Sequence, residues 1–371
     1  MRRILPYPKV YIYNGNANDN ENFFSFAQLF NEFFIPYPTL LTPGYNIQTA
    51  IAFIKIMRRR IFLLISLSLS ILCAHAQESQ TGYNFLRLPV SAHAAALGGE
   101  NITIIEDDPS LTFSNPALAA SVSDKTVGLN YMNYMKGANY GSASFTKAIK
   151  EKTTIAAGVQ YINYGKIKEV DEYNVQTGEF SASDIAINAT LAYQLGKFFV
   201  GGITAKFINS HIGSYNSIAM GVDLGLNFYD PDHEWSVSAV AKNLGGELKA
   251  YDEEYNKMPL DVQLGVSKTF NVLPIRVSAT LTDLTHYNYR FVNHLNLGAE
   301  ILLTDQIWVG AGYNFRRVDE MKIQEEDGES SHGAGVTLGA GVNLDRFKLN
   351  LSYGKYHVSS SSIMVSTAFC F

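Results

Sequence analysis

The chain has 371 residues, of which 47% are hydrophobic and 17% are charged, and its formal net charge is −5. The charged fraction lies below the quarter or so that is usual for soluble domains, and the acidic balance offers no general basic surface for nucleic acid. Tyrosine and phenylalanine, 22 of each, are abundant, as expected where a protein meets both an apolar and a polar medium.

The first recognisable segment is a secretion signal at residues 57–76. Three arginines at 58–60 precede the apolar stretch 61–72, which is too short to span a bilayer as a helix. The small-x-small pattern that ends at Ala76 predicts cleavage between Ala76 and Gln77. Cys73 leaves a lipoprotein open as an alternative, although the bulky Leu72 stands where a small residue is expected.

Residues 1–56 precede the signal and show no sustained hydrophobic period. Because a signal of this kind works at an N-terminus, we interpret residues 1–56 as an over-extended start and Met57 as the initiator. The alternative is a genuine cytoplasmic extension. After cleavage Cys370 is the one cysteine left, so an internal disulfide and a cysteine-based metal site are excluded.

From about residue 125 to the end, apolar and polar residues alternate with the period of a β-strand. In 347–356 (FKLNLSYGKY), for example, every second residue from Phe347 to Tyr353 is apolar. Fourteen segments of this kind follow one another, most of them near the 9–11 residues that a tilted strand needs to cross a membrane. They lie at about 126–135, 138–149, 153–164, 182–195, 197–209, 215–228, 233–243, 259–269, 274–284, 292–303, 306–317, 333–344, 346–356 and 361–371.

The connections between these segments alternate in length. Tight turns at 195–197, 229–233, 303–306 and 344–346 alternate with long polar loops at about 165–181, 244–258 and 317–332. Short periplasmic turns and longer outer loops are typical of outer-membrane barrels. The pattern therefore predicts an all-β fold: a transmembrane antiparallel β-barrel of about 14 strands over residues 125–371. The alternative is a secreted β-sandwich.

The last strand favours the barrel. It alternates from Ile363 to the end and closes on Phe369 and Phe371, which resembles the C-terminal signal by which outer-membrane barrels are recognised for assembly. Closure has a physical reason as well, since an open sheet edge in lipid leaves backbone N–H and C=O groups unpaired.

Residues 77–124 lack strand alternation and are rich in small residues. A barrel of fourteen strands has a lumen wider than its own side chains fill, so we predict that this segment is a periplasmic or luminal hatch. Because it comes before the first strand, we expect it to begin on the periplasmic side.

The hatch segment carries a family resemblance. Residues 83–118 (YNFLRLPVSAHAAALGGENITIIEDDPSLTFSNPAL) resemble the start of the mature PorQ proteins of the Bacteroidetes type IX secretion system. The Ala-Leu-Gly-Gly run, the paired acids and the Asn-Pro-Ala are shared more loosely by the wider PorV/FadL-like barrels, which have fourteen strands and an N-terminal hatch. The resemblance extends over residues 77–371.

The resemblance implies a non-enzymatic component of the cell-surface attachment complex in the outer membrane. Its implied partners are outer-membrane lipid, a PorZ-like surface protein, PorU- and PorV-like proteins and lipopolysaccharide, to which secreted cargo is attached. The rival hypothesis is a FadL-like channel for long-chain fatty acids or other hydrophobic small molecules. A channel predicts an apolar pocket against the hatch and a lateral opening; a scaffold predicts a filled lumen.

The residues that suggest chemistry have structural explanations. Adjacent acids on an extended segment point apart, whereas catalytic carboxylates must face one substrate atom. No G-x-S-x-G motif is present and the histidines are scattered, so we predict no catalytic site, no metal and no cofactor. We assign structural roles to the hatch motif residues Gly98, Gly99, Asp107, Asp108, Asn115, Pro116 and Ala117.

The 318–330 loop (VDEMKIQEEDGES) is strongly acidic but lacks the ligand spacing of a calcium loop. With the 250–257 loop it would form an acidic rim that contains tyrosine. Loops on a rigid scaffold carry recognition, so we predict that this rim binds a surface partner. The residues assigned to it are Asp319, Glu320, Glu325, Glu326 and Asp327.

Overall fold

The computed structural model describes residues 81–371, apart from 136, 174, 271–272, 326–327, 331–332 and 358–359. Every described residue belongs to one compact unit, Ala76–Phe371. The extension 1–56, the signal 57–76 and the cleavage site at Ala76 and Gln77 lie outside the described residues.

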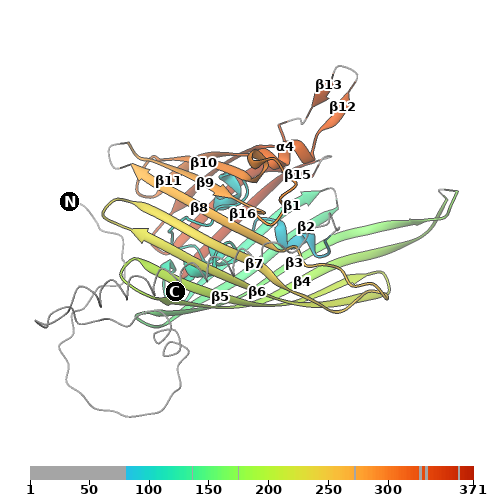
Figure 1. Ribbon diagram of the computed structural model, residues 1–371, viewed down its shortest axis with the longest axis horizontal. Helices are drawn as coiled ribbons and strands as arrows, with labels where there is room; N and C mark the ends of the chain where they lie inside the picture. Colours follow the sequence, from blue (N-terminus) through green and yellow to red (C-terminus); the bar gives the residue numbers. More distant parts are fainter. Residues whose placement is uncertain are drawn as a thin grey trace, which may run out of the picture. The chain divides into compact units, whose positions relative to one another are not determined.

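Fourteen antiparallel strands close into a barrel, as the alternation predicts, because β1 pairs with both β2 and β16 (Figure 1). The pairing follows chain order around the whole ring. The barrel strands are β1 (Thr126–Met135), β2 (Ala138–Lys150), β3 (Thr153–Val170), β4 (Gln176–Gln194), β5 (Phe199–Ile212), β6 (Tyr215–Asp230), β7 (Trp235–Lys249), β8 (Asp261–Phe270), β9 (Ile275–Leu281), β10 (Leu295–Leu302), β11 (Ile307–Asn314), β14 (Val336–Asn343), β15 (Phe347–His357) and β16 (Ser360–Cys370).

The apolar face of the strands points outward, which decides between the barrel and a soluble sandwich. Leu264 is 48% exposed on the outer wall, whereas its neighbour Gln263 is fully buried in the lumen. Leu351 and Asn350 repeat this arrangement. A soluble sandwich buries its apolar face, so an apolar exterior around a polar interior is the arrangement of a barrel that lies in lipid.

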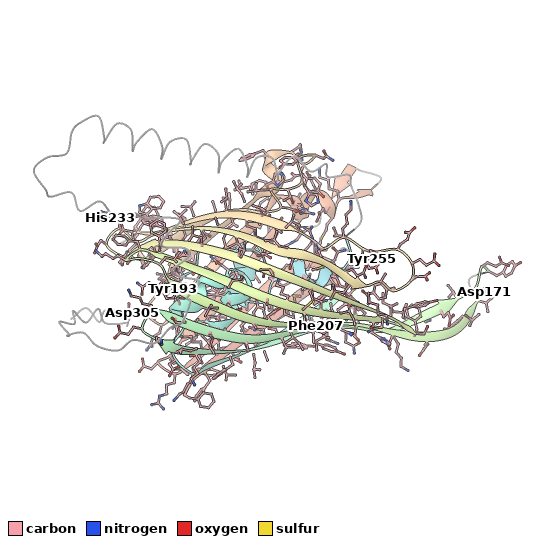
Figure 2. All side chains as sticks on the ribbon, turned by 60° about the horizontal axis from the view of Figure 1, so that its bottom comes forward. Asp171, Tyr193, Phe207, His233, Tyr255 and Asp305 are labelled. Carbon is pink, nitrogen blue, oxygen red and sulfur yellow. The ribbon has the colours of Figure 1, made fainter. Side chains whose placement is uncertain are left out.

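The two ends of the barrel differ, and we name them by their connections. At the turn end the strands join by tight turns, and β1 starts there while β16 finishes there. At the loop end, three connections (β1–β2, β5–β6 and β15–β16) are also short, whereas the others are longer and include η4 (Phe291–His294), α4 (Phe315–Glu320) and the hairpin of β12 (Ile323–Glu325) and β13 (Gly328–Ser330). Figure 2 shows His233 and Asp305 at the turn end and Asp171 and Tyr255 at the loop end.

Two long connections are shorter than the sequence predicts because their strands continue. The 165–181 segment was expected to be a loop, but β3 and β4 extend through most of it. Likewise β7 continues to Lys249 instead of ending near 243. The polar residues that suggested loops are strand residues here, since outside the membrane both faces of a strand can be polar.

The residues before β1 form the hatch, which lies inside the barrel and packs against its strands (Figure 1). Its elements are η1 (Asn84–Arg87), α3 (Ala92–Ala96), η2 (Pro109–Phe113) and η3 (Pro116–Ser121). Contrary to the expected periplasmic start, its first described residue, Thr81, bridges to Lys257 in the β7–β8 loop at the loop end. The hatch therefore runs down the lumen from the loop end to the turn end, where β1 begins.

Two apolar clusters hold the hatch. One joins Phe85 and Leu86 of η1 to wall residues such as Tyr140 and Met364. The other lies within the hatch itself and consists of Ala94, Leu97, Ile104, Leu111 and Leu118. Because each of these side chains is buried, burial of apolar area holds the segment against the wall. In the described part of the chain, none of the helices has the length and apolar character that a membrane crossing requires.

Candidate functional site

Gly98 and Gly99 form a close contact between the hatch and the barrel wall. Both have positive φ, 101° and 99°, a conformation that residues with a side chain rarely adopt. The Gly98 backbone passes so close to Gly312 of β11 that a Cβ on Gly312 would lie 2.0 Å from the Gly98 amide nitrogen. The Gly98 amide donates to Thr337 Oγ1 at 2.9 Å. The double glycine thus lets the hatch backbone hydrogen-bond directly to the wall.

Asp107 and Asp108 act separately. Asp108 caps η2, where its Oδ1 accepts a hydrogen bond from the Ser110 amide at 2.9 Å. Asp107 accepts from the Ser123 amide at 2.6 Å and pairs with Lys348 of β15 at 2.6 Å. The two carboxylates therefore have different partners and do not form an acid pair.

The Asn-Pro-Ala motif starts η3. Asn115 caps the helix, since its Oδ1 accepts from the Ala117 amide at 3.0 Å, and its amide group donates to the Ile102 carbonyl at 3.0 Å. Pro116 stands at the first helical position. The motif packs against Gly202 of β5 and Gly225 of β6, where an added Cβ would collide with it.

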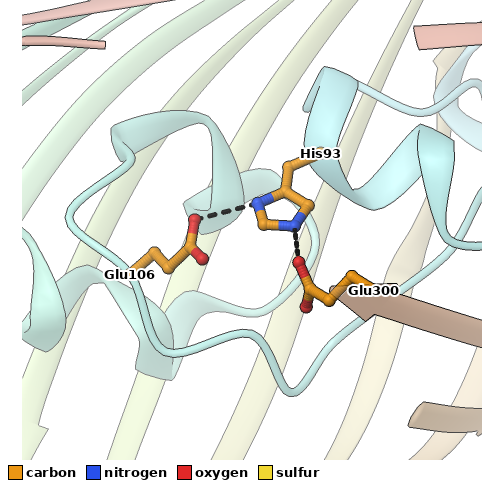
Figure 3. A group of neighbouring side chains, drawn as sticks. All are labelled: His93, Glu106 and Glu300. Carbon is orange, nitrogen blue, oxygen red and sulfur yellow. Dashed lines mark hydrogen bonds and ion pairs between the residues drawn. The ribbon is translucent and has the colours of Figure 1, made fainter. Parts of the chain in front are cut away.

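The hatch also carries a buried ion cluster on its middle part (Figure 3). His93 of α3 is fully buried, with Nδ1 2.9 Å from Glu106 and Nε2 2.7 Å from Glu300 of β10. Arg276 of β9 binds both carboxylates, reaching Glu106 Oε1 at 2.6 Å. The His93 ring stacks on Trp308 with a centroid separation of 3.7 Å. Two positive and two negative groups thus join the hatch to the wall.

The electrostatics of the cluster favour a protonated histidine. Burial alone lowers the pKa of His93, but the carboxylates of Glu106 and Glu300 outweigh it and raise the pKa to about 9. A doubly protonated imidazole donates from both nitrogens, which matches a carboxylate on each side of the ring. His93, Glu106 and Glu300 are also the residue types that ligate a metal ion. The Arg276 guanidinium already occupies both carboxylates, so the arrangement fits an ion-pair network better than a metal centre.

A second charged cluster lines the lumen near a bulge in β7. Lys206 Nζ lies 2.7 Å from Asp223 and donates to Asn243 Oδ1 at 2.7 Å. Lys242 pairs with Glu100 of the hatch at 3.5 Å. Next to this cluster, the enclosed space bordered by Phe113, Lys206 and Asp223 is about 10 Å³, room for about one water molecule. The lumen is charged and filled at this point.

The beginning of the hatch is tied to the loops at the loop end. The Gly82 amide donates to the Lys257 carbonyl at 3.0 Å, and the Tyr83 hydroxyl donates to Glu247 at 2.7 Å. Arg87 pairs at 2.9 Å with Asp283 in the β9–β10 connection, which also pairs with Arg316 of α4. Burial opposes the charged form of Asp283, yet the two arginines keep its pKa below the usual range.

The acidic rim residues differ in their surroundings. Asp319 pairs with Lys322 at 2.9 Å and with Arg290 at 2.5 Å; these bonds lower its pKa to about 2. Glu320 pairs with Arg316 at 2.5 Å. Glu325 closes β12, while Glu326 and Asp327 lie outside the described residues. Asp319 and Glu320 thus form ion pairs within α4 and with the residues next to it, whereas Asp252, Glu253 and Glu254 of the 250–257 loop are exposed.

The C-terminal strand β16 closes the barrel against β1. Phe369 stands opposite Val127 in the register and is 42% exposed on the outer wall. Phe371 lies edge-on to Phe369, with ring centroids 5.0 Å apart. Both rings therefore stand on the outer face at the turn end.

Comparison with known proteins identifies the family. The family described as "Type IX secretion system protein PorV" matches residues 74–282, more than half of the chain. The chain belongs to the PorV family. This family consists of outer-membrane barrels that share the FadL-like fold. No match was found among curated protein sequences.

Solved structures show the same fold. The toluene transporter TodX of Pseudomonas putida is similar with a TM-score of 0.52 and 13% identity, covering 78% of this chain and 98% of TodX. The TodX deltaS2S3 mutant, a monoaromatic hydrocarbon channel, has a TM-score of 0.52 and 14% identity, covering 75% and 98%. At this identity the similarity establishes the closed barrel, and function has to be argued from the chain's own residues.

The ion cluster was missed by the sequence reasoning. His93 was noted only as one of several scattered histidines, and Glu106, Arg276 and Glu300 were not singled out. One signal was available: Arg276 and Glu300 are charged residues at the lumen-facing positions of otherwise apolar-out strands. Their partners on the hatch could not be found from spacing, because 170 to 207 residues separate them.

Proposed function

We propose that this protein is a non-enzymatic, PorQ-like scaffold in the cell-surface attachment complex of the type IX secretion system. It lies in outer-membrane lipid and holds a PorZ-like surface protein at its loop end. Through that protein, and with PorU- and PorV-like partners, it assists the attachment of cargo to lipopolysaccharide. The family match and the PorQ-like hatch sequence support the assignment to this system.

One observation carries the scaffold proposal: the hatch fills the lumen and is bonded to the loops at the loop end. Gly82 holds the β7–β8 loop, and Arg87 holds α4 through Asp283. Binding loops that are already ordered lose less conformational entropy when a partner binds. A filled barrel with braced loops is therefore suited to hold a protein on its outer side.

A channel for a hydrophobic molecule is the second candidate, and one feature favours it. Next to the bulge in β7, an apolar groove of about 300 Å³ on the barrel wall is lined by residues that include Leu224, Leu226 and Leu264. Behind this wall, however, the lumen carries Lys206 and Asp223. A hydrophobic solute that crossed the wall there would meet charged groups, which oppose its passage.

The test is a pull-down from detergent-solubilised membranes through an epitope in the 318–330 loop. Recovery of a large surface protein together with lipopolysaccharide is expected; recovery of lipid or fatty acid alone would favour the channel. The deletion of 319–329 together with 251–256 should release a PorZ-like protein from the cell surface.

A finer variant keeps the backbone intact: Asp252→Asn, Glu253→Gln and Glu254→Gln on the exposed 250–257 loop. The matched control is Asp232→Asn with Asp305→Asn, which removes exposed acids at the turn end. Loss of the surface protein in the first variant and retention in the second is expected. Retention in both variants and in the deletion would contradict docking at this rim.

A further inference from the structure

The hairpin of β3 and β4 extends well beyond its neighbours at the loop end (Figure 1). The pairing of β3 with β2 reaches only Asn163, and that of β4 with β5 reaches only Ala182. The pairing of β3 with β4 continues to Val170 and Gln176. Residues 166–170 and 176–181 therefore form a two-stranded ribbon that no other described strand flanks.

Hydrogen bonds join Asp171 to Tyr173 and Val175 near the tip of this ribbon. Asp171 Oδ1 accepts hydrogen bonds from the amides of Tyr173 and Val175, both at 2.9 Å, and the Asp171 amide donates to the Val175 carbonyl at 3.0 Å. This turn leaves Tyr173 78% exposed and Val175 59% exposed. Figure 2 shows Asp171 at the far end of the hairpin. The ribbon is thus an ordered projection that presents apolar side chains to solvent.

The two faces of the ribbon differ. Phe180 is on the same face of β4 as Ala182 and Asp184, which are buried inside the barrel, and its cross-strand partner is Ile167. This apolar pair therefore stands on the side of the barrel axis. The other face carries Lys166 and Glu179, which pair at 3.2 Å.

The two edges differ as well. The β3 edge carries Lys166 and Lys168, and lysine is the residue by which natural edge strands discourage pairing. Along the β4 edge, from Gln176 to Ser181, Glu179 is the one charged residue. The Ser181 carbonyl points toward β5, because it accepts from the Gly213 amide at 2.9 Å. The N–H and C=O groups of successive residues point to alternate sides of a strand. Glu179 lies two residues before Ser181, so its N–H and C=O point to the same side as the Ser181 carbonyl. At Glu179 this side is not covered by β5, whose pairing with β4 ends at Ala182.

We propose that the β4 edge, residues 176–180, binds a surface partner by strand addition. The occupant is an exposed edge strand of an extracellular β-structured protein, which pairs with the backbone of Glu179 and sets an apolar residue beside Phe180. A two-stranded ribbon is marginally stable in water and gains from a third strand, and main-chain pairing to a free edge is an established mode of recognition. The inference rests on the proposed scaffold function and names the chemistry of its partner.

Two proline variants test the edge. Lys168 is the non-hydrogen-bonded partner of Glu179, so the N–H groups of both residues point away from the ribbon. Glu179→Pro removes the outward N–H of the β4 edge, and Lys168→Pro removes the outward N–H of the β3 edge. Neither change removes a hydrogen bond within the ribbon, and proline is tolerated at edge strands. Glu179→Gln removes the charge and keeps the donor.

The probe is the purified PorZ-like surface protein, and the readout is its Kd for the detergent-solubilised barrel. Glu179→Pro is expected to weaken binding by at least about tenfold, the effect of one or two lost hydrogen bonds. Lys168→Pro and Glu179→Gln are expected to bind within about twofold of the unaltered barrel. Hydrogen exchange of the Glu179 amide should be slower in the complex than in the free barrel.

The proposal would be overturned if Glu179→Pro bound the surface protein with an unchanged Kd. It would also be overturned if Lys168→Pro weakened binding as much as Glu179→Pro does. The Asp252, Glu253 and Glu254 variant separates this failure from that of the scaffold function. If that variant loses the partner while Glu179→Pro keeps it, the scaffold stands and strand addition fails. If the unaltered barrel does not bind the surface protein, both proposals fail.

Discussion

The ion cluster around His93 makes a quantitative prediction about pH. The pKa of this side chain rises from 6.5 to about 9 in the folded protein, a difference that corresponds to about 3 kcal/mol. Because the folded pKa is the higher one, this stabilisation is fully present below pH 6.5 and is lost as the pH rises through 9. The hatch should therefore be held firmly at neutral pH and loosen in alkali.

Trp308 provides the assay because the His93 ring stacks on it at 3.7 Å, and a protonated imidazole quenches indole fluorescence. In a Trp235→Phe background, the fluorescence of Trp308 should rise with a midpoint near pH 9. His93→Gln should abolish this transition. Glu300→Gln removes one of the two carboxylates that raise the pKa, so the midpoint should fall to below about 8.

A midpoint at or below 6.5 in the unaltered cluster would refute this reasoning, because it would show that burial outweighs the two carboxylates. A midpoint unchanged by Glu300→Gln would show that Glu300 does not contribute to the shift. The experiment needs no partner protein, so it tests the hatch independently of the proposed function.

Three further predictions concern the hatch and the loops. Asn115→Ala removes the cap of η3 and its bond to Ile102, and should destabilise the hatch by about 1–2 kcal/mol, measured as faster hydrogen exchange of its amides in a barrel that stays closed. Gly225→Leu should collide with the cap and expose the hatch to protease, whereas Gly246→Leu, where a Cβ meets nothing within 4 Å, should not. Asp283→Asn removes the carboxylate that Arg87 and Arg316 share and should speed hydrogen exchange in α4 while Tm changes little. Contrary results would be normal protease resistance of Gly225→Leu, or unchanged exchange in the other two variants.

The barrel could be predicted from the sequence because a strand in a membrane wall has a strict period of two. The start of β1 at Thr126 and the tight turn before Phe347 follow from alternation and turn residues alone. Where β3 and β4 extend beyond the barrel wall, neither face of the strands needs to be apolar. The alternation of apolar and polar residues therefore disappears, and the sequence of 165–181 resembles that of a loop. Alternation marks the membrane-facing part of a strand rather than its full length.

The site was less predictable because it depends on contacts between distant parts of the chain. Asp108 and Asn115 cap helices that begin one residue later, and such local roles are visible in the sequence. The ion cluster joins His93 to Glu300, and nothing local indicates that these residues meet. The path of the hatch was also hidden, since the sequence order places it next to β1 but does not show that Thr81 reaches the opposite end of the barrel.

The central claim is that a filled barrel holds a surface protein at its loop end. The most direct measurement places a photo-reactive amino acid in intact cells at Tyr255, exposed in the 250–257 loop, and at Asp305, exposed at the turn end. The account predicts a cross-link to a large surface protein from position 255 and none to that protein from position 305. Cross-linking of the surface protein from 305 alone, or from neither position, would contradict it.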